Sequence, residues 1–410
     1  MAESLQTRCC IAGGGPAGMM LGLLLARAGV DVIVLEKHAD FLRDFRGDTI
    51  HPSTLDVINE LGYLERFLKL PHQQVTRILG HVAGTAIHVA DFRHVPTHCR
   101  FIAMMPQWDF LNFLAAEGAR FPRFKLRMQA DVTGLIESQG RVTGVVASTP
   151  QGPLEVNADL TIGADGRHST VRDCAGLTVE ELGAPIDVMW FRLAHQPGDP
   201  TDSGGYFAPG YMFVMINRAD YWQCGFVIPK GKAEALRAEG LPAFRAKIVE
   251  QAPFTAKAAE QLRDWDEVSL LTVRVDRLEQ WYRPGLLCIG DAAHAMSPVG
   301  GVGINLAIQD AVATANLLAV PLREQRVTPD DLKAVQARRE WPTRVTQRVQ
   351  VIVQNNVIAN VLAGTGLGSG SKLPLPLRLL ERYPLLQRIP ARLIGVGVRP
   401  EHVRSPALPA

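Results

Sequence analysis

A glycine-rich turn over residues 13–18 constrains the fold of this chain more than any other feature of its sequence. A short apolar run precedes the turn, an apolar helical pattern follows it to Ala28, and a β-branched run then ends at Glu36. This order predicts a strand, a helix and a second, parallel strand that pack together as one unit. The chain is therefore expected to adopt an α/β fold built on a parallel sheet.

The spacing of the turn, Gly13-x-Gly15-x-x-Gly18, is typical of a dinucleotide site. Gly13 allows the tight turn, Gly15 lets the backbone approach a pyrophosphate, and Gly18 lets the helix pack closely on the strand. The helix N-terminus offers N–H groups and a partial positive charge to the phosphates. Glu36, at the end of the second strand, can accept both hydroxyl groups of a ribose. The turn alone does not separate NAD from FAD.

Two later motifs have a common form, in which a buried strand ends near an acid. The first strand reaches Asp165 at an Asp-Gly turn, and the second reaches Asp291 before a loop rich in glycine and proline. A helix is expected to begin after that loop, near Gly303 or Ile304. Its N-terminus suits an electron-rich oxygen, such as a flavin carbonyl that gains charge on reduction.

In this order and spacing, the three motifs resemble those of class A flavoprotein monooxygenases of the para-hydroxybenzoate hydroxylase type. The motifs span residues 8–316, and the tail over residues 394–403 is also similar to members of this group. The resemblance implies one non-covalent FAD, with NADPH or NADH as a transient co-substrate. It also implies that one oxygen atom from O₂ enters an aromatic or quinone-like molecule through a flavin C4a-hydroperoxide.

The resemblance also implies roles for single residues. Glu36 matches the acid on the adenosine ribose, and Arg46 matches an arginine near the FAD phosphates. Asp165 matches an acid associated with FAD and nicotinamide handling, and Asp291 an acid on the ribityl or pyrophosphate region. The expected cofactor-binding residues are Gly13, Gly15, Pro16, Ala17, Gly18, Glu36, Lys37, Arg46, Gln107, Val132, Asp165, Gly290, Asp291, Pro298, Gly301, Gly303, Ile304 and Asn305. Pro298 and Gly303 are expected to form a platform beside the flavin ring, and no catalytic base is assigned.

We predict a Rossmann-like FAD-binding domain of the GR2 type, an inserted antiparallel-sheet substrate domain and a helical C-terminal region. The predicted FAD-binding domain comprises residues 1–74, 100–176 and 273–320, the substrate domain residues 75–99 and 177–272, and the C-terminal region residues 321–410. Strand-like runs over residues 187–193, 211–216 and 221–228 are separated by turn signals. Helical patterns cover residues 236–251, 254–262 and 330–360.

The substrate segment is rich in aromatic and methionine side chains, and alternation along its strands sends about half of them into the core. We name Trp190, Arg192, Phe207 and Met215 as candidate substrate contacts. Arg192 could hold a carboxylate, but alternation equally allows it to point at solvent. We therefore favour a larger, mostly neutral aromatic or quinone-like molecule over a small benzoate.

Composition and residue spacing bear on nucleic acid, metal ions and membranes as possible partners. With 43 basic and 41 acidic residues, the chain has little excess charge for nucleic acid. Six cysteines without a Cys-x-x-Cys pair suit free thiols in a reducing cytoplasm, and the histidines show no metal-ligand spacing. The apolar run over residues 19–28 is too short to span a bilayer, so stable membrane insertion is not expected. The basic segment over residues 372–392, rich in leucine and proline, is expected to pack against the FAD domain or against a second subunit, as in a homodimer. A membrane-surface role for it is the less favoured alternative, because prolines interrupt any continuous amphipathic helix.

Three alternatives stay open at this level. A flavin-dependent halogenase shares the fold, but of its two signature tryptophans only Trp222 is present. A reductase of prenyl chains could use the same FAD scaffold. A non-catalytic escort protein on the FAD fold is the third, although the loop over residues 298–305 would have no use in it.

Overall fold

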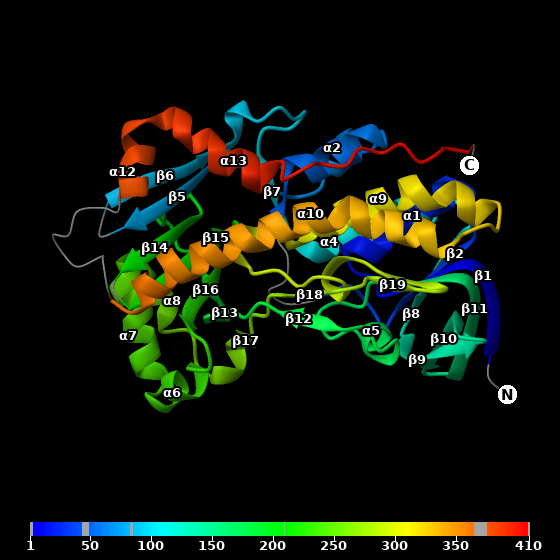
Figure 1. Ribbon diagram of the computed structural model, residues 1–410. Helices are drawn as coiled ribbons and strands as arrows, with labels where there is room; N and C mark the ends of the chain where they lie inside the picture. The colour runs from blue at the N-terminus through cyan, green and yellow to red at the C-terminus, as the bar shows by residue number, and fades with distance from the viewer. Residues whose placement is uncertain (1–2, 43–48, 83–84, 209, 365–374, 409–410) are drawn as a thin grey trace.

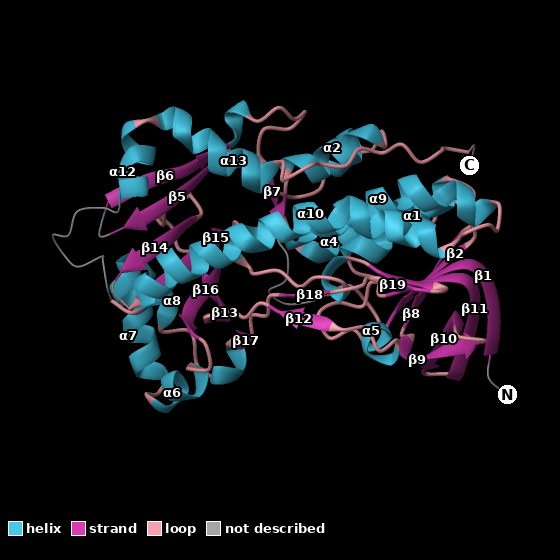
Figure 2. Ribbon diagram, in the orientation of Figure 1, coloured by secondary structure: helices cyan, strands magenta, loops and turns pink. Residues whose placement is uncertain are grey.

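The computed structural model describes residues 3–42, 49–82, 85–208, 210–364 and 375–408. Two large sheets lie at opposite ends of the molecule, and helices of the carboxyl-terminal half run between them (Figures 1 and 2). The predicted fold class, an α/β FAD-binding fold with a second sheet and a helical C-terminal region, is confirmed.

The first sheet has eight strands and contains the predicted parallel unit. Its strands are β1 (Glu3–Ala12), β2 (Val32–Glu36), β8 (Phe124–Met128), β9 (Asp131–Ser138), β10 (Arg141–Thr149), β11 (Gly152–Gly163), β19 (Tyr282–Arg283) and β20 (Leu286–Cys288). β20, β11, β1, β2 and β8 are parallel neighbours in that order. β19, β10 and β9 extend the sheet with antiparallel pairs.

Helices of this half include α1 (Pro16–Arg27), α2 (Pro52–Glu60), α3 (Leu64–Phe67), α4 (Gln107–Gly118), α5 (Thr170–Cys174) and α9 (Gly303–Arg323). α1 packs against both α4 and α9, which explains why its sequence is apolar nearly all round. The segment Val299–Arg323 is long and apolar enough to cross a membrane, but 83% of its most apolar window is buried inside the protein. α9 is therefore a core helix.

The second sheet has seven strands in the order β17-β13-β16-β15-β14-β5-β6. These are β5 (Arg77–Val82), β6 (Thr85–Asp91), β13 (Ile186–Ala194), β14 (Gly204–Ala208), β15 (Tyr211–Asn217), β16 (Tyr221–Pro229) and β17 (Ser269–Leu271). β13, β15 and β16 contain the three runs predicted as strands. Two segments far apart in sequence meet in this sheet, since β5 pairs in parallel with β14.

Three helices, α6 (Ala233–Ala238), α7 (Leu241–Gln251) and α8 (Ala256–Ala259), cover one face of the second sheet. The helix predicted over residues 236–251 is wrong in one respect, because it is broken between α6 and α7. Gly240 lies at this break with a φ of +89°. That backbone conformation ends a helix readily at glycine.

Two small sheets complete the fold. One pairs β12 (Val179–Glu181) with β18 (Asp276–Leu278), and the other consists of β3 (Thr49–Ile50), β4 (Gln73–Val75) and β7 (Ile102–Met104). The first lies where the chain leaves and re-enters the first sheet.

The predicted helix over residues 330–360 is present as α10 (Pro329–Val353), a π-helical segment (Gln354–Ile358) and α11 (Ala359–Leu362). α10 crosses the molecule from the first sheet toward the second (Figure 1). The chain then forms α12 (Leu375–Arg382) and α13 (Arg388–Gly395), and its last residues run back over the helices of the first sheet (Figure 1).

Candidate functional site

The three sequence motifs meet at one edge of the first sheet. They follow β1, β11 and β20, which are adjacent parallel strands, so their loops leave the sheet side by side. Backbone hydrogen bonds join them: the Ala164 amide donates to the Ala12 carbonyl at 2.8 Å, and the Ile289 amide donates to the Gly163 carbonyl at 2.9 Å. Ligands of open α/β sheets bind at this carboxyl edge.

The glycine-rich turn has the geometry expected of a phosphate-binding turn. Gly13 has a φ of +106°, and a Cβ there would come within 2.3 Å of the Ala164 carbonyl oxygen. A Cβ at Gly18 would lie 2.0 Å from the Gly13 oxygen, whereas one at Gly15 would meet no described atom within 4 Å. No described side chain caps α1. The first amides of this helix and the space at Gly15 therefore fit a pyrophosphate.

Glu36 lies buried at the end of β2, beside this turn. Its carboxylate accepts hydrogen bonds from the Gly14 amide at 3.0 Å and from the His38 amide at 3.1 Å. The Ala130 amide donates to the Glu36 carbonyl at 2.9 Å, which brings the buried Val132 close to the same strand end. This placement fits the predicted ribose contact of Glu36 and the predicted cofactor contact of Val132, while the side chain of Lys37 is exposed.

The Asp165 carboxylate is engaged within its own loop. It accepts from the Ser169 hydroxyl and, at 3.0 Å, from the Val171 amide at the start of α5. Burial raises the pKa of Asp165, and the hydrogen bonds from Ser169 and Val171 oppose that shift. The structure thus gives Asp165 a role in shaping the loop, and its predicted contact with cofactor stays a prediction.

The third motif is held in place by a buried ionic network that the sequence motifs did not indicate. Asp310 of α9 accepts from the Gly290 amide at 3.0 Å, from His294 Nε2 at 2.6 Å and from Arg339 Nε at 2.9 Å. Glu401, in the tail, lies 3.5 Å from Arg339. Burial raises the pKa of Asp310, but the charges of His294 and Arg339 outweigh burial and bring it below the ordinary value. His294 thus helps to hold the loop of the third motif in place.

This network fixes the turn that presents Asp291. The Asp291 side chain is half-buried and lies 3.4 Å from Arg167 of the second motif. Asp291 therefore faces the same loop cluster as the other two motifs, as a contact to the ribityl or pyrophosphate region requires.

The loop over residues 298–302 leads into the N-terminus of α9, which no described side chain caps. A Cβ at Gly303 would meet no described atom within 4 Å. On the other side of the loop, the Asn305 side-chain oxygen accepts from the Ser53 and Thr54 hydroxyls at 2.7 and 2.9 Å. The first amides of α9 thus border open space at Gly303, and this fits a flavin ring.

His51 joins this loop to the carboxyl-terminal helices. Its Nε2 lies 3.0 Å from the Gly301 carbonyl, and its Nδ1 lies 2.9 Å from the Ile394 carbonyl at the end of α13. Burial lowers the pKa of His51 to about 4, although both backbone hydrogen bonds raise it. The Thr49 hydroxyl also donates to the Gly301 carbonyl, at 2.9 Å.

The second sheet turns a half-exposed face toward this loop. On β15 the side chains of Phe213 and Met215 are buried against the helices, whereas Met212 and Val214 are only half-buried. Met212 and Val299 both pack against one apolar cluster, which also includes Ile358 of the π-helical segment. The half-buried face therefore lies on the side of the loop over residues 298–302, which we call the flavin loop. We call this face, with Trp190, Phe207, Met212 and Val214, the aromatic wall.

Glycines let the two rings of the aromatic wall lie flat on the sheet. A Cβ at Gly225 would come within 3.1 Å of the Trp190 ring, and one at Gly205 within 3.0 Å of the Phe207 ring. Gly225 and Gly205 occupy one row across the sheet, since both pair with Val214. The wall is therefore broad, flat and apolar, a shape that suits an aromatic ring system.

Two of the four candidate substrate contacts do not lie in the aromatic wall. Met215 is 1% exposed and packs in the core beneath α7, so the prediction that it contacts substrate is not supported. The sequence showed that side chains alternate along the strand, but not which of the two sets faces the core, and for this reason Met215 was named. Arg192, two residues after Trp190 on the same face of β13, is exposed and lies over the Tyr221 ring at 4.9 Å.

Other predicted residues have less direct placements. Gln107 is the first residue of α4, half-buried, and Pro298 is half-buried at the start of its loop. Arg46 lies outside the described residues. His51, Ser53 and Thr54 were missed, because nothing in the sequence around them marks a site. One feature of the sequence could have indicated Asp310, because it is the single acid in the apolar segment that forms α9.

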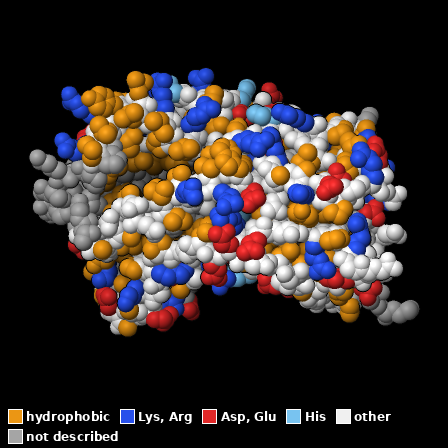
Figure 3. All heavy atoms as spheres, in the orientation of Figure 1, with side chains coloured by type: hydrophobic (Ala, Val, Ile, Leu, Met, Phe, Trp, Pro, Cys, Tyr) orange, Lys and Arg blue, Asp and Glu red, His pale blue; other side chains and the backbone are white. Residues whose placement is uncertain are grey.

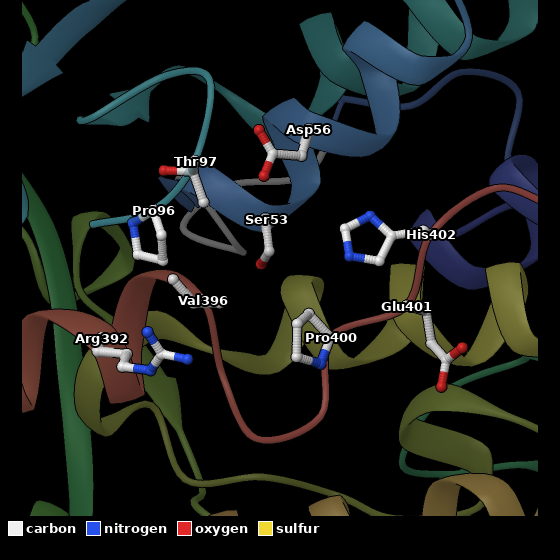
Figure 4. A pocket seen from close by; sticks show the side chains of 9 residues that line it. All are labelled: Ser53, Asp56, Pro96, Thr97, Arg392, Val396, Pro400, Glu401 and His402. Carbon is white, nitrogen blue, oxygen red and sulfur yellow. The ribbon is translucent and has the colours of Figure 1, made fainter.

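A cavity of about 110 Å³ lies behind this site, between α2, α13 and the tail (Figure 4). Ser53 points into it from α2, and Arg392 and His402 lie at its sides (Figure 4). Ligand pockets usually measure about 300 to 1,000 Å³. This cavity is therefore too small for a flavin or an aromatic substrate.

Comparison with known proteins agrees with this geometry. The model of the FAD binding domain family matches residues 6–349. The 6-methylpretetramide 4-monooxygenase of Streptomyces rimosus is 33% identical over 408 residues, which cover 98% of this chain and 96% of that relative. The rifampicin monooxygenase of Streptomyces venezuelae is 27% identical over 316 residues, 73% of this chain but 61% of that longer relative.

Among solved structures, the OxyS anhydrotetracycline hydroxylase from Streptomyces rimosus superposes with a TM-score of 0.73 at 23% identity. The superposition covers 95% of this chain and 76% of that structure, and it shows a shared fold. The chain therefore belongs to the FAD binding domain family and is an FAD-dependent monooxygenase of the class A aromatic hydroxylases.

Proposed function

We propose that this enzyme hydroxylates a flat, mostly neutral, polycyclic aromatic molecule held between the flavin loop and the aromatic wall. The observation that carries the proposal is the wall itself, where the rings of Trp190 and Phe207 lie flat over Gly225 and Gly205. The 6-methylpretetramide 4-monooxygenase, which matches 98% of this chain, carries a pretetramide substrate in its name, and this supports a substrate of this shape.

The residues of this chain bind, orient and exclude water. Bound FAD, reduced by NADPH or NADH, supplies with O₂ the electrophilic oxygen that electron-rich ring carbons accept. The amides at the start of α9 would hold the flavin ring, and Asn305 keeps the helix start in place through Ser53 and Thr54. The apolar wall orients the substrate face-on and keeps water from the reactive oxygen.

The position of Arg192 bears on the size of the substrate. Its guanidinium is exposed to solvent and lies over the Tyr221 ring rather than in a buried pocket. A small benzoate would need a buried cation as anchor. We infer that the preferred substrate gains its affinity from ring stacking and apolar contact.

The alternative activities find less support. Trp222 is 1% exposed, and its indole nitrogen donates to Asp199 at 2.9 Å, so it acts within the core rather than as half of a halogenase signature. A prenyl-chain reductase would have no need of a wall with flat rings. An escort protein would have no need of the fixed loop at Gly301.

We infer that the reaction takes place in the cytoplasm. The described cysteines are all free thiols, and five of the six are buried, as in a reducing compartment. A homodimer is the remaining expected partner, and light scattering of the FAD-loaded protein tests it.

The test is a substrate panel of polycyclic phenols, quinolones, simple phenols and benzoates, scored by hydroxylated product formed per NAD(P)H oxidised. We expect tight coupling with polycyclic phenols. Gly225→Ala should displace the Trp190 ring and lower kcat/KM for the best substrate by about tenfold, with FAD affinity unchanged. Gly134→Ala, on β9 with no described atom within 4 Å of its Cβ, is the matched control. Coupling only with a benzoate, lost in Arg192→Ala, would overturn the proposal.

A further inference from the structure

The helices α12 and α13 carry the same surface pattern twice. Exposed apolar side chains recur every four residues, at Leu375, Leu379 and Tyr383 and again at Leu385, Ile389 and Leu393. An exposed arginine directly precedes four of them, at positions 378, 382, 388 and 392. Tyr383 directly follows α12, and Leu385 lies in the 3₁₀ turn Pro384–Gln387 that leads into α13. Residues four apart lie on one helix face, so each helix with its adjoining turn presents an apolar row beside an arginine row.

The outward rows are not needed to hold these helices on the protein. Leu377 of α12 packs with Val82 and Ile87 of the second sheet. Ala391 of α13 is fully buried and packs with Phe92. Each helix therefore has an inner face that packs on the protein, while the outer rows keep a large part of their apolar surface exposed.

The exposure of the outer rows is large. Leu375, Leu385 and Ile389 are 65, 68 and 59% exposed. In the space-filling view, hydrophobic side chains and Lys or Arg side chains gather over α12 and α13 at the upper left (Figure 3). Apolar patches of this kind on a folded protein mark interaction sites.

The charge of this surface indicates which kind of partner binds it. Residues 375–395 contain four arginines and one acid, Glu381. In a symmetric contact with a second copy of the chain, the same arginine rows would face one another and repel. An anionic lipid surface would accept the arginines at its headgroups and the apolar rows at the acyl boundary.

We propose that α12 and α13 form a peripheral membrane-binding surface that recognises anionic lipid. The two helices lie in the plane of the interface, with the leucine and isoleucine rows at the acyl boundary and the arginines among the headgroups. This association involves no membrane-spanning segment and is separate from the hydroxylation reaction.

The experiment is vesicle flotation of the FAD-loaded protein with phosphatidylcholine alone and with phosphatidylcholine mixed with phosphatidylglycerol. We expect binding to the phosphatidylglycerol vesicles only, and release when the salt concentration is raised. Arg388→Gln with Arg392→Gln should lower the partition coefficient by about tenfold or more. Leu385→Ser with Ile389→Ser should lower it by a similar factor, because it removes two apolar side chains from the interface.

The matched control is Leu270→Ser with Arg263→Gln, which changes an exposed leucine and an exposed arginine away from α12 and α13. It should bind vesicles as the parent protein does. Absence of vesicle binding by the parent protein would overturn the proposal. So would equal, salt-independent binding to both vesicle types. A dimer in light scattering that Leu385→Ser with Ile389→Ser converts to monomer would assign the surface to a second copy instead.

Discussion

At the scale of single residues, the site depends on side chains that fix backbone loops. Glu36 accepts two amide hydrogen bonds and His51 contacts two carbonyl groups, so each of them ties segments that are distant in sequence. Such residues act on the candidate cofactor site through the geometry of its loops.

Glu36→Gln should weaken FAD binding. The substitution replaces a carboxylate that accepts from Gly14 and His38 with an amide that has one acceptor oxygen. Loss of a charged hydrogen-bond partner costs about 1 to 3 kcal/mol, so the dissociation constant should rise roughly tenfold or more. Fluorescence titration of the apoprotein with FAD measures it. Asp31→Asn, at the opposite end of the same strand region and paired with Arg123 at the surface, should leave the constant unchanged.

His51 should make the protein sensitive to acid. Its pKa is about 4 in the folded state, below the ordinary value near 6.5, so the unfolded chain binds a proton first as the pH falls. Stability from this residue is complete above pH 6.5 and is lost between pH 6.5 and 4, by up to about 3 kcal/mol. Urea unfolding across this window should show a smaller loss for His51→Gln than for the parent protein. His98→Gln, at an exposed histidine, should follow the parent curve.

At the scale of elements, α9 and α10 are joined by charges where helices usually meet through apolar contact. Asp310 and Arg339 are both at most 1% exposed, and they connect the third motif to the tail. Removing one partner of a buried pair leaves the other charge without compensation.

Asp310→Asn should therefore lower the free energy of unfolding by about 3 to 5 kcal/mol, because Arg339 and His294 lose their shared carboxylate. Urea unfolding followed by circular dichroism measures it. Glu324→Gln, at the exposed Glu324–Arg326 pair after the end of α9, should cause no measurable change. Equal effects of the two substitutions would contradict the role given to the network.

At the scale of the whole molecule, the tail closes the fold over the helices of the first sheet. The Val403 amide donates to Glu60 of α2 at 2.7 Å, and the Ser405 amide donates to Asn316 of α9 at 2.8 Å. Glu401 forms a bidentate pair with Arg338 of α10 at 2.7 and 3.1 Å. The tail thus connects three helices that the earlier part of the chain places side by side.

Deletion of residues 398–410 should lower the free energy of unfolding by about 3 kcal/mol or more, because it removes Glu401, which pairs with the buried Arg339. Thermal unfolding with and without added FAD measures it. Deletion of residues 406–410 keeps Glu401 and the Asn316 contacts and serves as the control. If both deletions behaved alike, the tail would contribute through its end rather than through Glu401.

The sequence predicted those parts of the molecule that depend on residues close together in the chain. The turn at Gly13 and the start of α9 at Gly303 follow from spacing, since a glycine cluster between a strand and a helix has few other uses. The sequence did not predict which side chains of β15 face the core. Phe213 and Met212 are both apolar, so alternation alone does not distinguish the buried face from the exposed one. The pairing of Asp310 with Arg339, 29 residues away, depends on how two helices pack. No local pattern records such a contact.

The position of His51 has one more consequence. A neutral imidazole carries a single N–H, yet this ring faces two carbonyl oxygens, one on Gly301 and one on Ile394. Only one of them can receive that hydrogen at a time, while the other faces a lone pair. Because Gly301 already accepts a hydrogen from Thr49, the tautomer protonated at Nδ1, toward Ile394, leaves fewer oxygens without a donor. The Gly301 carbonyl of the flavin loop and the Ile394 carbonyl of α13 therefore compete for the single N–H of His51. A stronger hydrogen bond from His51 to either carbonyl weakens its hydrogen bond to the other.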